Sequence, residues 1–212
     1  MCKKLISVFL TLMISVFALS ACGGSRLSDS DMDIYEKIHT YYSKMESYSA
    51  NVTFSCFSNK TENKYTAEQK AMGNDKFFIK VSNPDSTLSV TTIANGAKTK
   101  TLTDGTDYSV TVPTADTTNL LFVNSFFKTY YSSEETYLAV NGAGKGNVTV
   151  LETDISPKSA NSAKVSLSIN NKTLAPVNLT VYDMGGKVVL SAEFSNFQYN
   201  DKSVTDTDFT TD

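Results

Sequence analysis

Few residues of this chain have the chemistry and setting that catalysis requires. The sequence contains one histidine, His39, so a Ser-His-Asp triad would have to use it and no second imidazole could complete a zinc site. His39 is expected at the polar boundary of a helix, with its side chain in solvent. Cys56 could pair with it, but this thiol is expected to be buried and inert beside Val52 and Phe54 on an apolar strand face.

Two short motifs resemble parts of enzyme signatures but lack their partners. Residues 125–128 spell the S-x-x-K opening of penicillin-recognising enzymes, yet S-D-N and K-T-G are absent. The glycine-rich run at 142–146 lacks the spacing of a phosphate-binding loop, and a predicted strand follows where a helix should begin. No spacing singles out a carboxylate pair among the scattered acidic residues, which leaves such a pair open. The sequence therefore predicts a protein with no catalytic residue, no metal and no other cofactor.

Cys22 has a more distinctive setting than the other cysteines. The chain starts with Met-Cys-Lys-Lys, and residues 5–20 form an apolar run. A membrane-spanning helix needs about 20 apolar residues. A secretory signal has a basic start, a shorter apolar middle and small residues at its cleavage site. The small residues Ser20 and Ala21 lead directly into Cys22, so residues 1–21 are predicted to be a signal peptide.

The order Leu19-Ser20-Ala21-Cys22 resembles the lipobox of bacterial lipoproteins. In that family the cysteine thiol receives a diacylglyceryl group, and the chain is cut just before the cysteine. The resemblance implies that Cys22 is the first mature residue and that acyl chains such as palmitate anchor it to the outer face of the cell membrane. The alternative is an ordinary secretory signal in which Cys22 stands by chance.

Charge and length limit the classes of partner and fold. Removal of residues 1–21 from the 212-residue chain would leave 17 basic and 22 acidic residues, a net charge of −5. An acidic domain is a poor match for nucleic acid or for an anionic membrane surface. We expect residues 22–30 to be a lipidated, flexible tether and residues 31–212 to be a single domain, long enough to bury a core without disulfides.

Two segments carry apolar residues at helical spacing. The first is 31–47, with Ser30 as N-cap and Asp33 completing a variant of the capping box. The second is 117–131, where one broad apolar face opposes Asn124, Ser125, Lys128 and Thr129. That apolar face consists of Leu120, Val123, Phe126, Phe127 and Tyr130. A helix this apolar must lie against something, so we expect a plug in the fold or a lid that forms a ligand or partner face.

The period changes to two elsewhere, which predicts two β regions. The first comprises strands at 49–58, 64–72, 76–82, 87–94, 97–103 and 106–112. Its last three strands are separated by Asn95-Gly96 and Asp104-Gly105, the residue pairs that tight hairpins favour. The second comprises strands at 146–155, 162–170, 176–183 and 186–197, with the last turn at 183–186. Helix, sheet, apolar helix and sheet in this order indicate an α+β fold.

This order, with two quoted segments, resembles the LolA/LolB-like family of bacterial lipoprotein carriers. The segments are YEKIHTYYSKMESYSANVTF at 35–54 and LAPVNLTVYDMGGKVVLSAEFSNFQYN at 174–200, the latter followed by Phe209. In that family a proline opens a late strand, an Asp-x-x-Gly turn follows, and an F-x-N-F strand closes the sheet. The resemblance implies a curved antiparallel sheet, an incomplete barrel, that wraps around the N-terminal helix and the central apolar helix.

The resemblance also sets the expectations for function. Lipoproteins of this fold in Gram-positive spore formers include one that binds and activates a cortex-processing amidase. We therefore expect a non-catalytic, membrane-anchored protein of the bacterial cell envelope that binds a protein partner, such as a cell-wall hydrolase, as an adaptor or regulator in germination. The alternative is a carrier of acyl chains, lipid or lipoprotein in the concave face of the sheet. An enzyme of the envelope is a third class, for which the sequence offers no catalytic groups.

Overall fold

The computed structural model describes residues 28–58, 60–82, 88–113, 121–140 and 147–211. Contacts divide the chain into two units, Met1–Glu36 and Lys37–Asp212. Helix α2 (Asp29–Ser43) crosses this division, and every other described element belongs to the second unit. The predicted signal peptide, the lipobox with Cys22 and Leu120 of the apolar helix lie outside the described residues.

Helix α2 begins two residues before the predicted start. The Asp31 N–H donates to Ser28 Oγ at 3.2 Å, and the Ser28 N–H donates to the Asp31 carboxylate at 3.3 Å. This is a capping box, which satisfies two backbone donors of the first turn. The prediction placed the box at Ser30 and Asp33 and is wrong, because both pairs have the same Ser-x-x-Asp spacing. The helix ends at Ser43 rather than at 47, since strand β1 already begins at Ser47.

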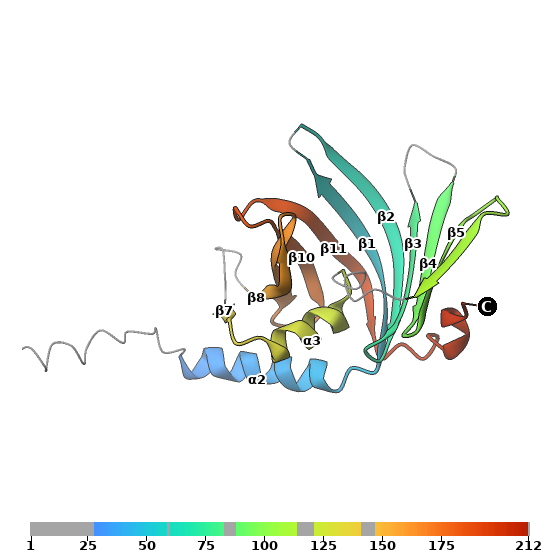
Figure 1. Ribbon diagram of the computed structural model, residues 1–212. Coiled ribbons are helices and arrows are strands. Elements are labelled where there is room, and N and C mark those ends of the chain that lie inside the picture. The colour runs from blue at the N-terminus through green and yellow to red at the C-terminus, as the bar shows by residue number, and fades with distance from the viewer. Residues whose placement is uncertain (1–27, 59, 83–87, 114–120, 141–146, 212) are drawn as a thin grey trace, which may run out of the picture. The chain divides into compact units, whose positions relative to one another are not determined.

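The described strands form one antiparallel sheet of eleven strands, shown in Figure 1. Their order across the sheet is β6-β5-β4-β3-β2-β1-β11-β10-β9-β8-β7, so the first and last strands of the chain meet in the middle. The sheet curves and does not close, which confirms the predicted α+β class and the incomplete barrel. The strands are β1 (Ser47–Phe57), β2 (Glu62–Met72), β3 (Lys76–Ser82), β4 (Ser89–Asn95), β5 (Lys98–Thr103), β6 (Ser109–Pro113), β7 (Thr136–Val140), β8 (Val148–Ser159), β9 (Ser162–Asn170), β10 (Pro176–Tyr182) and β11 (Val188–Tyr199).

The predicted strands agree with this order, apart from their ends and from β7. Both expected hairpin turns between β4 and β6 are present, and Gly96 and Gly105 adopt φ of +87° and +78° there. A side chain would be strained in that left-handed region, which explains the glycines. The sequence does not predict β7, because four of its five residues, from Tyr137 to Val140, are apolar and do not alternate with polar ones.

Alternating burial along the strands defines an inner and an outer face of the sheet. Strand β1 buries Tyr48, Ala50, Val52 and Phe54 on the inner face. Helix α3 (Val123–Ser132) lies within the curve of the sheet, on this face (Figure 1). The core of the second unit therefore lies between the concave side of the sheet and α3.

The C-terminal residues 200–211 pack against the outer face and form what we call the C-terminal clasp. Its short helix η3 (Asp206–Phe209) contacts β3 and β4, and Phe209 is buried. Lys70 on β2 donates a hydrogen bond to Asp208 at 2.7 Å. The clasp thus covers the outer face of the sheet at the end where the chain leaves β11. The burial of Phe209 explains why an apolar residue follows the last strand in the sequence.

Candidate functional site

Helix α3 carries the residues that the sequence analysis assigns to a plug or to a ligand and partner face. The four of them that the structure describes are all buried, with exposures of 0% for Val123, 1% for Phe126, 4% for Phe127 and 5% for Tyr130. Phe122, directly before the helix, is 3% exposed. The role of this stripe as a plug or as a binding face stays a prediction.

Aromatic contacts fix α3 on both sides. The ring of Phe122 lies 4.7 Å from that of Phe77 on β3. On the other side, Phe127 stacks on Tyr42 of α2 at 4.1 Å with an interplanar angle of 23°. Such pairs add to the stabilisation that burial provides. The helix is therefore attached to the sheet and to the C-terminal half of α2 at once.

A buried polar network joins α3 to the centre of the sheet. The Tyr48 hydroxyl donates to Gln69 Oε1 at 3.2 Å and accepts from the Val123 N–H at 3.2 Å. Gln69 Nε2 in turn donates to the Leu121 carbonyl at 3.3 Å. Burial raises the pKa of Tyr48, only partly offset by the backbone hydrogen bond from Val123, so the hydroxyl stays protonated and can donate.

This network was not expected from the sequence, although Gln69 provides a signal for it. Gln69 stands between Ala67 and Ala71, at the position in β2 where the period of two demands an apolar side chain. Its side chain is completely buried. A long amide at such a position must find partners, because an unpaired buried polar group is costly.

Asn124 is a correction to the predicted polar face of the helix. It is only 8% exposed, and its Nδ2 donates to the Gly73 carbonyl at 2.5 Å. The β2–β3 turn approaches α3 closely there, which buries the first turn of the helix on two sides. Of the four residues expected on the polar face, Lys128 is exposed and Ser125 and Thr129 are half-buried.

A groove of about 630 Å³ runs beside α3. Its aromatic and thioether side chains could receive an apolar group, and Glu46 and Lys128 supply one charge of each sign. The volume lies in the range of ligand pockets, about 300–1,000 Å³. The lining residues are Tyr42, Ser43, Met45, Glu46, Met72, Gly73, Asn74, Asn124, Phe127, Lys128 and Tyr131.

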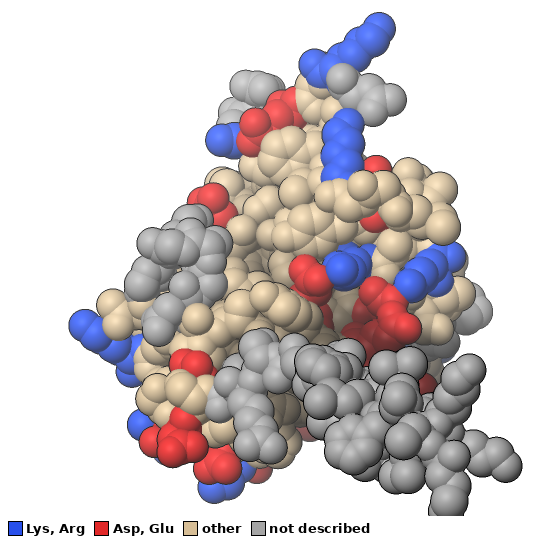
Figure 2. Space-filling model, turned by 90° about the vertical axis from the view of Figure 1, so that its left-hand side faces the viewer, with Lys and Arg blue, Asp and Glu red and all other residues tan. Residues whose placement is uncertain are grey.

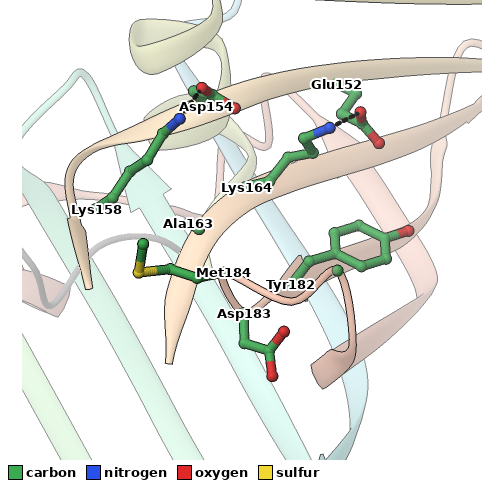
Figure 3. A pocket seen from close by; sticks show the side chains of 9 residues that line it. Glu152, Asp154, Lys158, Ala163, Lys164, Tyr182, Asp183 and Met184 are labelled. Atoms are coloured by element: carbon green, nitrogen blue, oxygen red, sulfur yellow. Dashed lines mark ion pairs between the residues drawn. The ribbon is translucent and has the colours of Figure 1, made fainter. Parts of the chain in front are cut away.

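A second pocket, of about 420 Å³, is lined by charged residues of β8 and β9 and by the β10–β11 turn (Figure 3). Glu152 pairs with Lys164 at 2.8 Å, and Asp154 pairs with Lys158. The hydrogen bond to Glu152 raises the pKa of Lys164, and that to Asp154 raises the pKa of Lys158. Both amines therefore stay charged at neutral pH, so neither is a nucleophile or a base.

His39 and Cys56 do not form a reactive pair in the structure. His39 is an exposed residue of α2, and its ring meets that of Tyr131 edge-on at 5.0 Å. Cys56 lies near the end of β1, opposite Leu190. The expectation that Cys56 is fully buried is wrong, since the strand end leaves its side chain partly exposed. Partial burial still raises the pKa of the thiol, which disfavours the reactive thiolate.

Two further findings concern the described part of the chain only. Within it, no three His, Cys, Asp or Glu side chains gather closely enough to hold a metal ion. None of the helices described there combines the length and the apolar character needed to cross a membrane.

Charges of both signs are interspersed on the face shown in Figure 2. Lysine side chains stand next to acidic ones, among a larger area of uncharged residues. Proteins that bind nucleic acid present a basic stripe or patch instead. The described surface in this view has no such stripe, in keeping with the acidic balance of the sequence.

Solved structures with a similar fold come from several bacteria. An uncharacterised conserved protein from Thermus thermophilus has 14% sequence identity and a TM-score of 0.52, over 85% of this chain and 93% of that one. A LolA superfamily protein, NE2245 from Nitrosomonas europaea, has 15% identity and a TM-score of 0.45, over 85% and 97% of the two chains. Both identities are low, and the likeness concerns the fold alone.

A third similar structure is that of the CwlD amidase from Clostridioides difficile in complex with the GerS lipoprotein. The identity is 24% and the TM-score 0.47, over 82% of this chain and 98% of the matched chain. This identity is also below 25%, and the likeness again concerns the fold alone.

The comparison of sequences alone identifies the family. No curated protein matches the chain. The family model described as "Sporulation protein YdcC-like", in contrast, matches residues 3–209. Because this match spans almost the entire sequence, the chain belongs to the family of YdcC-like sporulation proteins.

Proposed function

We propose that this protein is a membrane-anchored lipoprotein of the bacterial cell envelope that acts without catalysis, as a protein-binding adaptor or regulator. The observation that carries the proposal is the filling of the concave face by the protein's own helix. With Phe126 and Val123 almost completely inaccessible, the part of the sheet beneath α3 has no space for a guest. A curved sheet that is filled in this way serves as a rigid support for surfaces rather than as a container.

The anchor rests on the sequence. Leu19-Ser20-Ala21-Cys22 follows a basic start and an apolar run of signal-peptide length. Two acyl chains on Cys22 would give stable attachment, whereas one chain gives only marginal binding. The domain would then sit outside the cell membrane at the end of the tether at 22–30.

The partner we propose is a cell-wall amidase that acts on spore cortex. Support comes from membership in a sporulation family and from the sequence resemblance to germination lipoproteins. The groove beside α3 is the surface we assign to this partner, because it combines apolar side chains with exposed Tyr131 at its edge. Aromatic residues set in grooves are frequent anchors in protein interfaces.

Purification of the protein from sporulating cells of its host tests the adaptor function. We expect a cortex amidase to co-purify, and we expect its activity on isolated cortex to rise when the purified lipoprotein is added. Tyr131→Ala should weaken both effects. Tyr137→Ala is the matched control, because Tyr137 is also exposed, at 59%, but lies on β7 and does not line the groove.

Three outcomes separate the possibilities. If the amidase neither binds nor responds while another protein co-purifies, the adaptor function stands and the amidase does not. If Tyr137→Ala and Tyr131→Ala act alike, the groove is not the contact surface. If purified protein carries lipid and no protein, the adaptor function is wrong.

A carrier of acyl chains is the second candidate, and one observation favours it. Part of the inner face lies beyond α3, and it exposes apolar residues to solvent. Val90 on β4 continues the inner-face row of Val52, Ala67 and Val81, yet it is 40% exposed. Mass spectrometry of lipid extracted from the purified protein tests this candidate. Val90→Asp should abolish any bound lipid, while Val177→Asp, at an equally exposed position of β10, should leave it.

A further inference from the structure

Strand β6 (Ser109–Pro113) forms one free edge of the sheet. It pairs with β5 on one side, and no described strand lies on its other side. An edge strand presents unpaired N–H and C=O groups, which can pair with another chain. The hydrogen bonds between β6 and β5 determine which backbone N–H and C=O groups of β6 remain available at the free edge.

The hydrogen-bond pattern shows which residues of β6 point away from the sheet. The Thr103 N–H donates to the Tyr108 carbonyl at 3.3 Å, so this cross-strand pair is of the hydrogen-bonded type. Pairs of the two types alternate along antiparallel strands. The pairs of Ser109 with Leu102 and of Thr111 with Lys100 are therefore of the other type. The backbone N–H and C=O groups of Ser109 and Thr111 consequently point outward, to the free edge.

The side chains of the same strand form an apolar stripe. Tyr108, Val110 and Val112 alternate with Ser109 and Thr111, so all three lie on one face. Their exposures are 62%, 40% and 48%. Outward backbone groups and an exposed apolar stripe on one strand together match an extended polypeptide with the same alternation.

We propose that this polypeptide is the β6 strand of a second copy of the protein, paired antiparallel about a two-fold axis at Val110. The pattern of β6 reads the same in both directions from Val110, with a hydroxyl residue on each side and an apolar residue beyond it. In this register each Ser109 exchanges two hydrogen bonds with Thr111 of the second copy. Tyr108 then lies opposite Val112, on the same face, in both halves of the interface.

The proposed interface is limited to two copies of the protein and is weak. A two-fold arrangement uses the same surface on both copies, so pairing stops at two. Five residues per strand bury less than the about 1,000 Å² that stable interfaces need. Confinement to a membrane would compensate, because tethering raises the effective concentration of the second copy. This last step rests on the proposed anchor, whereas the pairing itself does not.

Disulfide trapping tests the pairing in the full-length chain, produced in its bacterial host. Opposed residues of a non-hydrogen-bonded pair have Cα atoms about 4.5 Å apart, within the about 4.4–6.8 Å of disulfides. Val110→Cys in a Cys56→Ser background should therefore give a covalent dimer when membranes are oxidised. Val177→Cys is the matched control, since Val177 is also 40% exposed but lies on β10. It should give no dimer, and any bond through another cysteine would appear equally in both.

A proline at position 111 tests whether the free edge of β6 is what holds the dimer together. Thr111→Pro removes an outward N–H and keeps the ladder to β5, so the chain should fold but lack one pairing group of the free edge. The covalent dimer of Val110→Cys should be lost with Thr111→Pro and kept with Thr111→Ala. Tyr108→Lys, which leaves the backbone intact, should also lower the dimer yield and replaces the proline variant if that variant does not fold.

Each remaining outcome overturns the proposal. A Val110→Cys dimer no more abundant than that of Val177→Cys would show that the strands do not meet. A dimer that survives Thr111→Pro in a folded chain would show that the edge groups do not hold it. A cross-link of Val110→Cys to a different protein, without the dimer, would assign the edge to that partner. None of these results bears on whether the protein binds an amidase.

Discussion

Replacement of Phe126 by aspartate places a carboxylate at the centre of the contact between α3 and the sheet. The Phe126 side chain is 1% exposed and stacks on Tyr130 at 5.8 Å, with Phe127 edge-on at 5.4 Å. The variant therefore removes an aromatic ring from a packed site. It also introduces a group that must either lose its hydration or pull the helix away from the sheet.

Loss of the ring alone sets a lower bound on the effect. Truncation of a buried phenylalanine to alanine costs about 3–5 kcal/mol. In a domain of this size, 1 kcal/mol shifts the melting midpoint by about 2–4 °C, so Phe126→Ala should lower it by about 6–20 °C. Phe126→Asp adds the cost of burying a charge. Since domains are stable by only about 5–15 kcal/mol, we expect Phe126→Asp to unfold the second unit.

Thermal melts followed by circular dichroism measure the effect. Lys128→Asp is the matched control, because it adds the same carboxylate two residues further along the helix, at an exposed position. Its midpoint should stay close to that of the unchanged protein, since surface substitutions rarely change the free energy of unfolding by more than about 0.5 kcal/mol.

An unchanged midpoint in Phe126→Asp would refute the assignment of α3 as a fixed plug. It would mean that the helix leaves the sheet at little cost and acts as a movable lid. The carrier function would then be favoured, and the variant should bind an apolar dye that the unchanged protein does not bind.

Further predictions follow from the anchor, the buried network and the clasp. Cys22→Ala should abolish fatty-acid labelling and release the protein from the membrane fraction once the signal is removed; persistent attachment would contradict the lipobox assignment. Tyr48→Phe should cost about 1–3 kcal/mol in urea unfolding, because it leaves buried partners of the hydroxyl unsatisfied. Burial is the largest single influence on the pKa of Asp208 and would raise it, but the hydrogen bonds from Lys70 and Thr205 and the charge of Lys70 together lower this pKa below its usual value. Stability from this pair is complete above about pH 4 and is lost as the pH falls through the lowered pKa, so Asp208→Asn should lose less stability on acidification than the unchanged protein.

The sheet could be predicted in most of its parts because its turns carry strong local signals. Asn95-Gly96 and Asp104-Gly105 fix two hairpins by the need for positive φ, and the structure has both turns. The closing turn at 183–186 is equally clear, since Asp183 accepts hydrogen bonds from the backbone of Gly185 and Lys187. Strand β7 is not predicted although Asn141-Gly142 follows it, because its run from Tyr137 to Val140 is uniformly apolar and shows no period of two.

The site was less predictable than the fold, because its details depend on contacts between distant segments. The apolar stripe of α3 follows from helical spacing alone. The burial of Asn124 does not, since it results from the approach of the β2–β3 turn, 51 residues away in sequence. The partial exposure of Cys56 likewise depends on where the neighbouring strands end rather than on its own alternation.

The central pairing of β1 with β11 has a consequence for the order in which the molecule folds. Strands β1 to β6 form one consecutive meander and β7 to β11 another, and each can pair locally as it emerges. The seam between them joins Tyr48 to Tyr199, so it cannot form until nearly the whole chain has been synthesised. Contacts of such long sequence separation slow folding, because the entropy of closing the intervening loop is lost before any hydrogen bond forms across the seam. Until then each half keeps an open edge, at β1 and at β11, that the other half alone completes. Two separately produced halves, divided between β6 and β7, should therefore recognise each other and assemble along this seam.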